Sequence, residues 1–135
     1  PIWLRAAGGR PAEALRLARS GRPPARWAAL PREVARGDLA ALADGTPAEA
    51  VDSLQKLCHD LMLRQMGAEP RFFAAADLPE LPASPRMLKQ LGDWARDLRR
   101  EARQVEHPFN AGLMLEALVS RAQQALHSPR TARPT

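Results

Sequence analysis

The sequence contains no tyrosine, one cysteine and two lysines, although 20 of its 135 residues are basic. The single cysteine, Cys58, excludes an internal disulfide and a zinc site built from several cysteines. We expect Cys58 to be a buried thiol within a helix. Residues branched at the β-carbon are scarce, and the 45% apolar content comes mostly from alanine and leucine, which favour helices. The composition therefore predicts an all-α protein.

Several features that would indicate a function class are missing as well. The sequence has no apolar run of about 18 residues and no charged-then-apolar leader, so we expect a cytoplasmic protein without a membrane partner. It has no GxxxxGK[ST] loop, no GxGxxG motif and no HExxH motif. The histidines His59, His107 and His127 lie far apart in the sequence. We therefore expect no catalytic residue, no metal site, no cofactor and no enzyme activity.

Positive charge is abundant but dispersed. The formal net charge is +5 and the pI is about 10.9, with 18 arginines and two lysines spread over every segment. The densest run of arginines has helical spacing and acidic neighbours, which predicts a solvated helix face. A small basic helical nucleic-acid-binding module remains an alternative. The arginines of this run are Arg96, Arg99, Arg100 and Arg103, with Asp93, Asp97 and Glu101 as expected partners.

Three segments have apolar residues at three- and four-residue steps, which predicts long helices near residues 47–66, 85–105 and 109–126. Thr46 and Glu49 form a capping-box pattern at the start of the first. Because each of these helices has an apolar face to bury, they should pack against one another around one core.

Shorter elements complete the expected bundle of about five helices. A helix is expected around Trp27, where Pro31 should interrupt or restart it. The segment 68–83 should be a loop that the Phe72–Phe73 pair pins to the bundle. Together with the long helices, these elements predict a bundle over residues 23–127.

The ends of the chain are expected to behave differently from the bundle. Arg22–Pro24 is a stiff joint, so we place a domain boundary there and expect residues 1–22 to form a loosely attached helical hairpin turning at Gly8–Gly9. The tail 128–135 has no large apolar residue, and we expect it to be disordered.

Apolar positions within the long helices fall into two groups. Trp94 and Leu118 lie in the middle of their stripes, which predicts that both belong to the core. Leu63, Leu113 and Met114 lie outside the main stripes, and we expect them to contribute to a partner interface.

Two strings, HDLMLRQMGAEPRFF at 59–73 and HPFNAGLMLEALV at 107–119, resemble the delta-prime subunits of the bacterial DNA polymerase III clamp loader. A third, LRAAGGRPAEALRLA at 4–18, resembles the sensor-2 region of the AAA+ lid in clamp loader subunits. In that alignment Ala12 replaces the arginine that touches nucleotide in the ATP-binding subunits. Delta-prime subunits do not bind ATP, so this degenerate region favours them over the motor subunits. Its residues are Gly9, Arg10, Pro11 and Ala12.

The resemblance implies a remnant of the AAA+ lid at 1–22 and a helical collar domain at 23–127. Collar domains of five subunits pack into a ring, so the implied partners are the delta and gamma or tau subunits. Sliding clamp and primed DNA would be reached only through the whole complex. The sequence opens without an initiator Met, and we expect it to be cut from a longer protein whose AAA+ module is not included. We also expect that it neither binds nor hydrolyses ATP.

Overall fold

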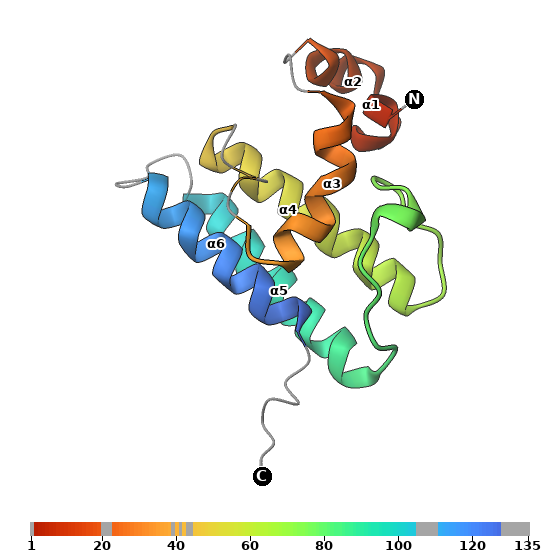
Figure 1. The fold of residues 1–135 in the computed structure, drawn as a ribbon, viewed down its shortest axis with the longest axis vertical. Coiled ribbons are helices and arrows are strands. Elements are labelled where there is room, and N and C mark those ends of the chain that lie inside the picture. The colour runs from red at the N-terminus through yellow and green to blue at the C-terminus, as the bar shows by residue number, and fades with distance from the viewer. Residues whose placement is uncertain are drawn as a thin grey trace.

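The computed structural model describes residues 2–19, 23–38, 40, 42, 45–104 and 111–127. These residues form helices joined by turns and loops, without any strand, which confirms the all-α class (Figure 1). Among the described residues, four α-helices follow the first two, and a short 3-10 helix lies in the segment 68–83 that was expected to be a loop. The elements are α1 (Ile2–Ala6), α2 (Pro11–Ala18), α3 (Pro24–Ala35), α4 (Pro47–Gln65), η2 (Ala75–Asp77), α5 (Pro85–Gln104) and α6 (Ala111–Leu126).

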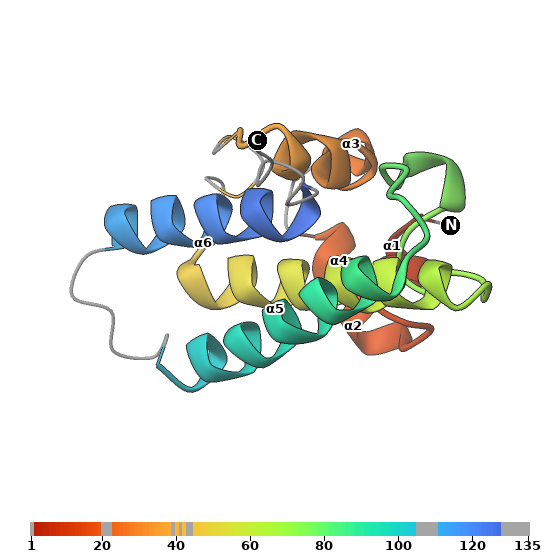
Figure 2. The ribbon, with the colours of Figure 1, turned by 90° about the horizontal axis from the view of Figure 1, so that it is seen from below.

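The three long helices pack on one another and form the body of the molecule. Each of α4, α5 and α6 contacts the other two, and α5 runs antiparallel to both α4 and α6 (Figure 2). Helix α3 lies across the end of α6, and the α1–α2 hairpin adjoins α3. The first turns of α6 extend beyond the start of α4 (Figure 2). Part of α6 is therefore less covered by neighbouring helices than the middle of α4.

The apolar stripes predicted from the sequence meet in one core. Trp94 is 2% exposed and Leu118 is 4% exposed, which confirms that both are core residues. The residues of this core come from every long helix, from α3 and from the loop after α4. Its largest fully buried apolar side chains are Phe73, Leu54, Leu57, Leu61, Met87, Leu91, Leu98, Val34, Val51, Pro31 and Cys58.

The start of α4 has the predicted capping box. The Thr46 hydroxyl accepts the backbone N–H of Glu49 at 3.2 Å, and the Glu49 carboxylate accepts the backbone N–H of Thr46 at 2.8 Å. Pro47 occupies the first helical position, where its missing N–H has no intrahelical partner to lose. These local contacts explain why the start of this helix was predictable to the residue.

The prediction that Pro31 interrupts or restarts a helix is wrong, because α3 runs through it without a break. A proline inside a helix leaves the carbonyl four residues earlier, here that of Trp27, without its usual donor. Pro31 is fully buried, and Leu30 and Val34 on either side are buried too. Burial of this apolar face offsets the cost of the missing hydrogen bond.

The expected loose attachment of the α1–α2 hairpin is also wrong. Ala6 is 0% exposed and belongs to the same core cluster as the long helices. Arg5 donates to the carbonyl of Phe73 at 3.3 Å, and Arg71 donates to that of Gly8 at 3.0 Å. Gly8 has a φ of 67°, and a Cβ added there would lie 2.9 Å from Phe72. The turn is therefore shaped to fit the loop after α4.

Some sequence predictions fall outside the described residues. These are Arg22 of the expected joint, the beginning of the helix predicted near 109–126, and the tail 128–135. In the rest of the joint, Pro23 is extended as expected, whereas Pro24 is already the first residue of α3. The domain boundary and the disordered tail stay predictions.

Candidate functional site

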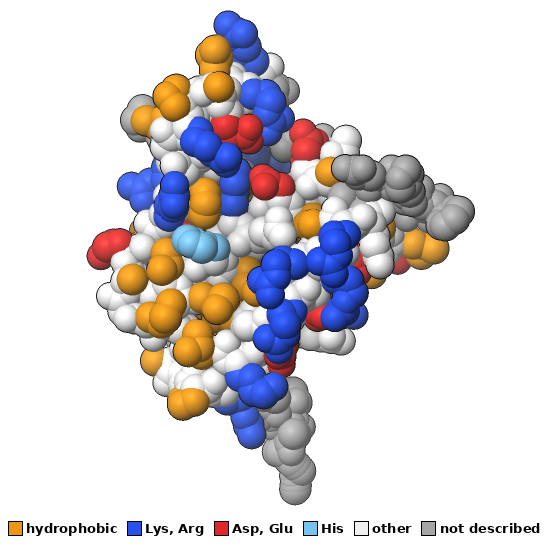
Figure 3. Space-filling model, turned by 180° about the vertical axis from the view of Figure 1, so that it is seen from behind, with side chains coloured by type: hydrophobic (Ala, Val, Ile, Leu, Met, Phe, Trp, Pro, Cys, Tyr) orange, Lys and Arg blue, Asp and Glu red, His pale blue; other side chains and the backbone are white. Residues whose placement is uncertain are grey.

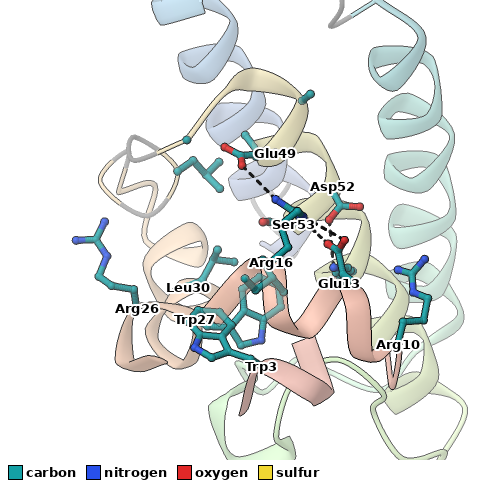
Figure 4. Close-up of a pocket in the computed structure, with 16 residues that line it drawn as sticks. Trp3, Arg10, Glu13, Arg16, Arg26, Trp27, Leu30, Glu49, Asp52 and Ser53 are labelled. Atoms are coloured by element: carbon teal, nitrogen blue, oxygen red, sulfur yellow. Dashed lines mark hydrogen bonds and ion pairs between the residues drawn. The ribbon is translucent and has the colours of Figure 1, made fainter. Parts of the chain in front are cut away.

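A cleft with a volume of about 350 Å³ lies where α2, α3 and the start of α4 meet (Figure 4). One wall is apolar and includes two tryptophans from different elements, Trp3 of α1 and Trp27 of α3. Trp27 also stacks on Phe73, with ring centroids 4.3 Å apart, so this wall of the cleft is continuous with the core. The other apolar lining residues include Leu17, Leu30 and Leu42.

The opposite wall of the cleft is charged. Arg16 reaches from α2 between two carboxylates, at 2.6 Å from Glu13 and 3.8 Å from Glu49 of α4 (Figure 4). The hydrogen bond from Arg16 is the largest influence on the pKa of Glu13, which lies below its ordinary value. The same bond raises the pKa of Arg16. The ion pair between Arg16 and Glu49 joins the hairpin to the bundle.

Lys56 is the most deeply buried cation at the cleft. Its side chain is 7% exposed, and its Nζ lies 3.2 Å from the Asp52 carboxylate. The ammonium also sits 5.8 Å from the ring centroid of Trp27 and 5.5 Å from that of Phe72. Carboxylate and aromatic rings together compensate for the lost hydration of this ammonium. The charges of the cleft are thus engaged in holding the fold together.

The degenerate sensor-2 region lies at the turn into α2. Gly9 has a φ of 85°, which explains a glycine at this turn, whereas Pro11 and Ala12 are exposed at the start of the helix. Arg10 lines the cleft, and its Nε donates to the carbonyl of Ala7 at 3.1 Å. Within the described chain this arginine closes its own turn.

The three predicted interface residues are not brought together. Leu63 is half-buried near the end of α4, while Leu113 is 62% exposed in the first turn of α6. Met114 is half-buried and packs against the core. The end of α4 and the start of α6 lie at opposite ends of the bundle in both views (Figures 1 and 2). A single partner surface containing Leu63 and Leu113 would have to span the whole bundle.

An exposed stripe on α6 was missed from the sequence. Four residues separated by steps of four, three and four lie on the side of α6 opposite its buried residues, and all four are exposed. Glu116 and Arg121, the only charged residues of this 16-residue helix, flank the stripe on its two sides. Plotting the polar side of α6, rather than its apolar side, would have revealed it. The stripe consists of Leu113, Ala117, Ser120 and Gln124.

The arginine run on α5 is exposed, as predicted, with acidic partners on one flank. Asp93 pairs with Arg96, and with Lys89 at 3.1 Å. Asp97 pairs with Arg100 at 3.3 Å and with Arg121 of α6 at 2.5 Å. Glu101, the third expected partner, forms no ion pair among the described residues.

The back of the molecule separates two kinds of side chain (Figure 3). A band of basic side chains follows α5, and apolar side chains gather beside it over the end of α4 and the following loop. Met66, at the end of α4, is 61% exposed. Basic and apolar surfaces therefore lie on different elements of this face.

Asp60 is a buried residue whose role the sequence did not reveal. It is 0% exposed, and its two carboxylate oxygens accept the backbone N–H groups of Arg71, Phe72 and Phe73 at 2.9, 2.8 and 2.8 Å. The adjacent His59 Nδ1 lies 3.2 Å from the same carboxylate. An aspartate directly before a buried leucine was the only signal. The predicted pinning by aromatics is confirmed for Phe73, which is 1% exposed.

The remaining reactive side chains lie in separate places. His127 Nε2 lies 3.1 Å from the carbonyl oxygen of Ala35, whereas His59 lies within α4 beside Asp60. Cys58 is 1% exposed, as predicted, and its thiol donates to the carbonyl of Leu91 at 3.3 Å. Burial raises the pKa of the Cys58 thiol to about 12. This thiol is therefore protonated and unreactive at neutral pH.

Searches for similar proteins and for metal or membrane sites give negative results. No family model, curated protein or solved structure matches this chain. Across the described ranges, no group of three histidine, cysteine or acidic residues could hold a metal ion. None of the described helices combines the length and apolar character needed to cross a bilayer.

Proposed function

We propose that this chain is a subunit-assembly domain whose α6 binds a helix of a related subunit. The proposal rests mainly on the exposed, uncharged stripe of α6 formed by Leu113, Ala117, Ser120 and Gln124. Steps of four, three and four residues are those at which one helix packs along another, and small residues allow close approach of the two backbones. Leu113, at 62% exposure, supplies the apolar anchor at one end.

Charge on both sides of the stripe supports a partner with a defined orientation. Glu116 lies on one flank and Arg121, which pairs with Asp97 of α5, on the other, so a partner helix with a basic residue opposite Glu116 would be held in one direction. Charges at the flanks of a helix seam select partners more than they add affinity. The stripe therefore suits a specific partner of similar architecture.

The resemblance of three strings to clamp loader subunits supplies the partners. We infer a collar domain of the delta-prime type, which takes part in clamp loading during DNA replication by joining the delta and gamma or tau subunits. This role is non-enzymatic and belongs to a cytoplasmic complex, and the sliding clamp and primed DNA are reached through the whole complex. The string at 107–119 includes the first half of α6, where the stripe begins.

Sedimentation velocity tests this proposal directly. The protein is mixed with collar domains of the delta and gamma or tau subunits at tens of micromolar, and a complex is expected without nucleotide. Ala117→Arg places a large charge in the stripe and should abolish the complex. Ala18→Arg introduces the same side chain at an exposed position of α2 and should leave it intact. No complex with the unaltered protein, or equal effects of the two variants, would refute the proposal.

A further inference from the structure

We propose that the outer face of α5 binds the phosphate backbone of double-stranded nucleic acid without reading its bases. This property goes beyond assembly through α6 and uses a different face of the molecule. Helices α5 and α6 contact each other, but the basic residues of α5 and the stripe of α6 lie on the solvent sides of two different helices.

The cations of α5 are placed on its solvent side by helical geometry. The helix buries Met87, Leu91, Trp94 and Leu98, which define its inner side. At about 100° per residue, its six basic residues project from the opposite half, and all six are exposed. They form the basic band seen along α5 in Figure 3. The six residues are Arg86, Lys89, Arg96, Arg99, Arg100 and Arg103.

Acidic residues of the same helix neutralise only part of this charge. The six cations face three carboxylates, which leaves a surplus of three positive charges on α5, compared with +5 for the whole sequence. Asp93 and Asp97 lie in exposed ion pairs, which are weak and can exchange for a stronger anion. Arg99 and Arg103 have no carboxylate partner within the described ranges. These two arginines are the most available for an external anion.

The spacing of the cations suits a long, regular polyanion. From Arg86 to Arg103 the helix rises about 26 Å, at 1.5 Å per residue. Duplex DNA carries about one charge per 1.7 Å of its axis, so several phosphates lie within reach of one such helix. Guanidinium groups bind phosphate oxygens in a bidentate manner, and five of the six cations are arginines.

The absence of aromatic side chains from this face indicates the form of nucleic acid. Single-strand binders add stacking of bases on aromatic rings to their phosphate contacts. The one aromatic residue of α5, Trp94, is 2% exposed and faces the core. A duplex, with its higher charge density and stacked bases, gains most from such a face. Binding should therefore be independent of sequence and strongly dependent on salt.

Fluorescence anisotropy with a labelled duplex of about 15 base pairs, titrated between about 50 and 200 mM salt, tests this inference. The unaltered protein should bind with an affinity that falls steeply as salt increases. The double variant Arg99→Gln, Arg103→Gln should reduce the log–log salt slope by about 2 and the affinity at the lowest salt by about tenfold. A random duplex of different sequence should bind equally well.

The matched control is Arg19→Gln with Arg64→Gln, which removes the same charge from exposed positions at the ends of α2 and α4. Both double variants should keep the melting temperature, because all four side chains are exposed. Lack of binding at the lowest salt, or an equal loss in the control, would overturn the inference. So would equal competition by polyglutamate or by anionic vesicles, which would assign the face to an acidic protein or to a membrane. Leu113→Ala, which should weaken the assembly complex without changing any charge, should not change duplex binding, so failure here is distinct from failure of the assembly proposal.

Discussion

Asp60 shows how one side chain can order a whole segment. Its carboxylate satisfies three consecutive N–H groups of residues 71–73, in a segment without regular structure. Without this carboxylate the buried N–H of Phe73 would lack an acceptor, at a cost of about 1–3 kcal/mol, and the half-buried N–H groups of Arg71 and Phe72 would lose the same acceptor. The ordered segment stacks Phe73 on Trp27 and lets Arg71 donate to the carbonyl of Gly8. A single acidic residue thereby connects α4, the loop and the hairpin.

Replacing Asp60 with Asn should destabilise the protein by about 1–3 kcal/mol, because an amide has one acceptor oxygen and turns a donor toward the remaining N–H groups. Urea unfolding followed by circular dichroism measures this free energy. Asp93→Asn, at a position whose side chain is 44% exposed, is the control and should change it by less than about 0.5 kcal/mol. Equal effects of the two substitutions would show that the Asp60 contacts contribute little.

Cys58 gives a second prediction for a single residue. With a pKa of about 12, only about one thiol in ten thousand is ionised at pH 8, compared with about a quarter for an exposed cysteine. Reaction of the native protein with a thiol-specific reagent at pH 8 should therefore be at least about a hundredfold slower than reaction of the urea-unfolded protein. A native rate within tenfold of the unfolded rate would mean that the thiol is accessible.

At the scale of elements, α6 has two faces with different expected roles. Leu118, Val119, Ala122 and Leu126 are buried against the bundle, whereas the stripe that begins at Leu113 is exposed. In α3, by contrast, packing decides whether the helix persists, since burial around Pro31 maintains it through a residue that disfavours helix. Packing therefore decides whether a segment stays helical, whereas the residues left exposed decide what the helix can bind.

Two leucines of α6 allow these roles to be separated by the same substitution. Leu118→Ala removes a side chain that is 4% exposed and should lower the free energy of unfolding by about 2–5 kcal/mol. Leu113→Ala, at 62% exposure, should change it by less than about 0.5 kcal/mol while weakening the complex with collar partners. Thermal unfolding and sedimentation velocity measure the two effects. A large loss of stability from Leu113→Ala would contradict the assignment of its face to partner binding.

At the scale of the whole molecule, the hairpin and the bundle share one core. Ala6 lies in the common cluster, and Arg16 connects α2 to Glu49 of α4. Contacts between the Gly8 turn and Arg71 add a second connection. The two segments should therefore unfold together.

We expect one unfolding transition by calorimetry, with the same midpoint by circular dichroism and by tryptophan fluorescence. Ala6→Asp puts a charge into the shared core and should lower this single midpoint, because a buried unpaired carboxylate is costly. Ala12→Asp, at an exposed position in the first turn of α2, should leave it nearly unchanged. An early, separate transition for the hairpin would contradict a shared core.

The protein should neither bind nor hydrolyse ATP, and Ala12→Arg should not restore binding. A sensor arginine acts on a nucleotide that a phosphate-binding loop already holds, and the sequence has no such motif. Isothermal titration calorimetry of both forms measures this. Saturable heat from either form at millimolar ATP would refute the prediction.

The sequence by itself determined the helical class, the three long helices, the capping box at Thr46 and the core positions of Trp94 and Leu118. These features depend on neighbours within a few residues, since helical periodicity and caps are local. Tertiary structure alone decided how Asp60 orders the loop, why α3 continues through Pro31, and where the hairpin packs. Each of these depends on burial by residues distant in sequence, for example the 13 positions between Asp60 and Phe73. The exposed side of the α5 arginines was predictable from their helical spacing. For α6, the fold added that no other part of the described chain covers the stripe, because only packing shows whether a solvent-facing side stays uncovered.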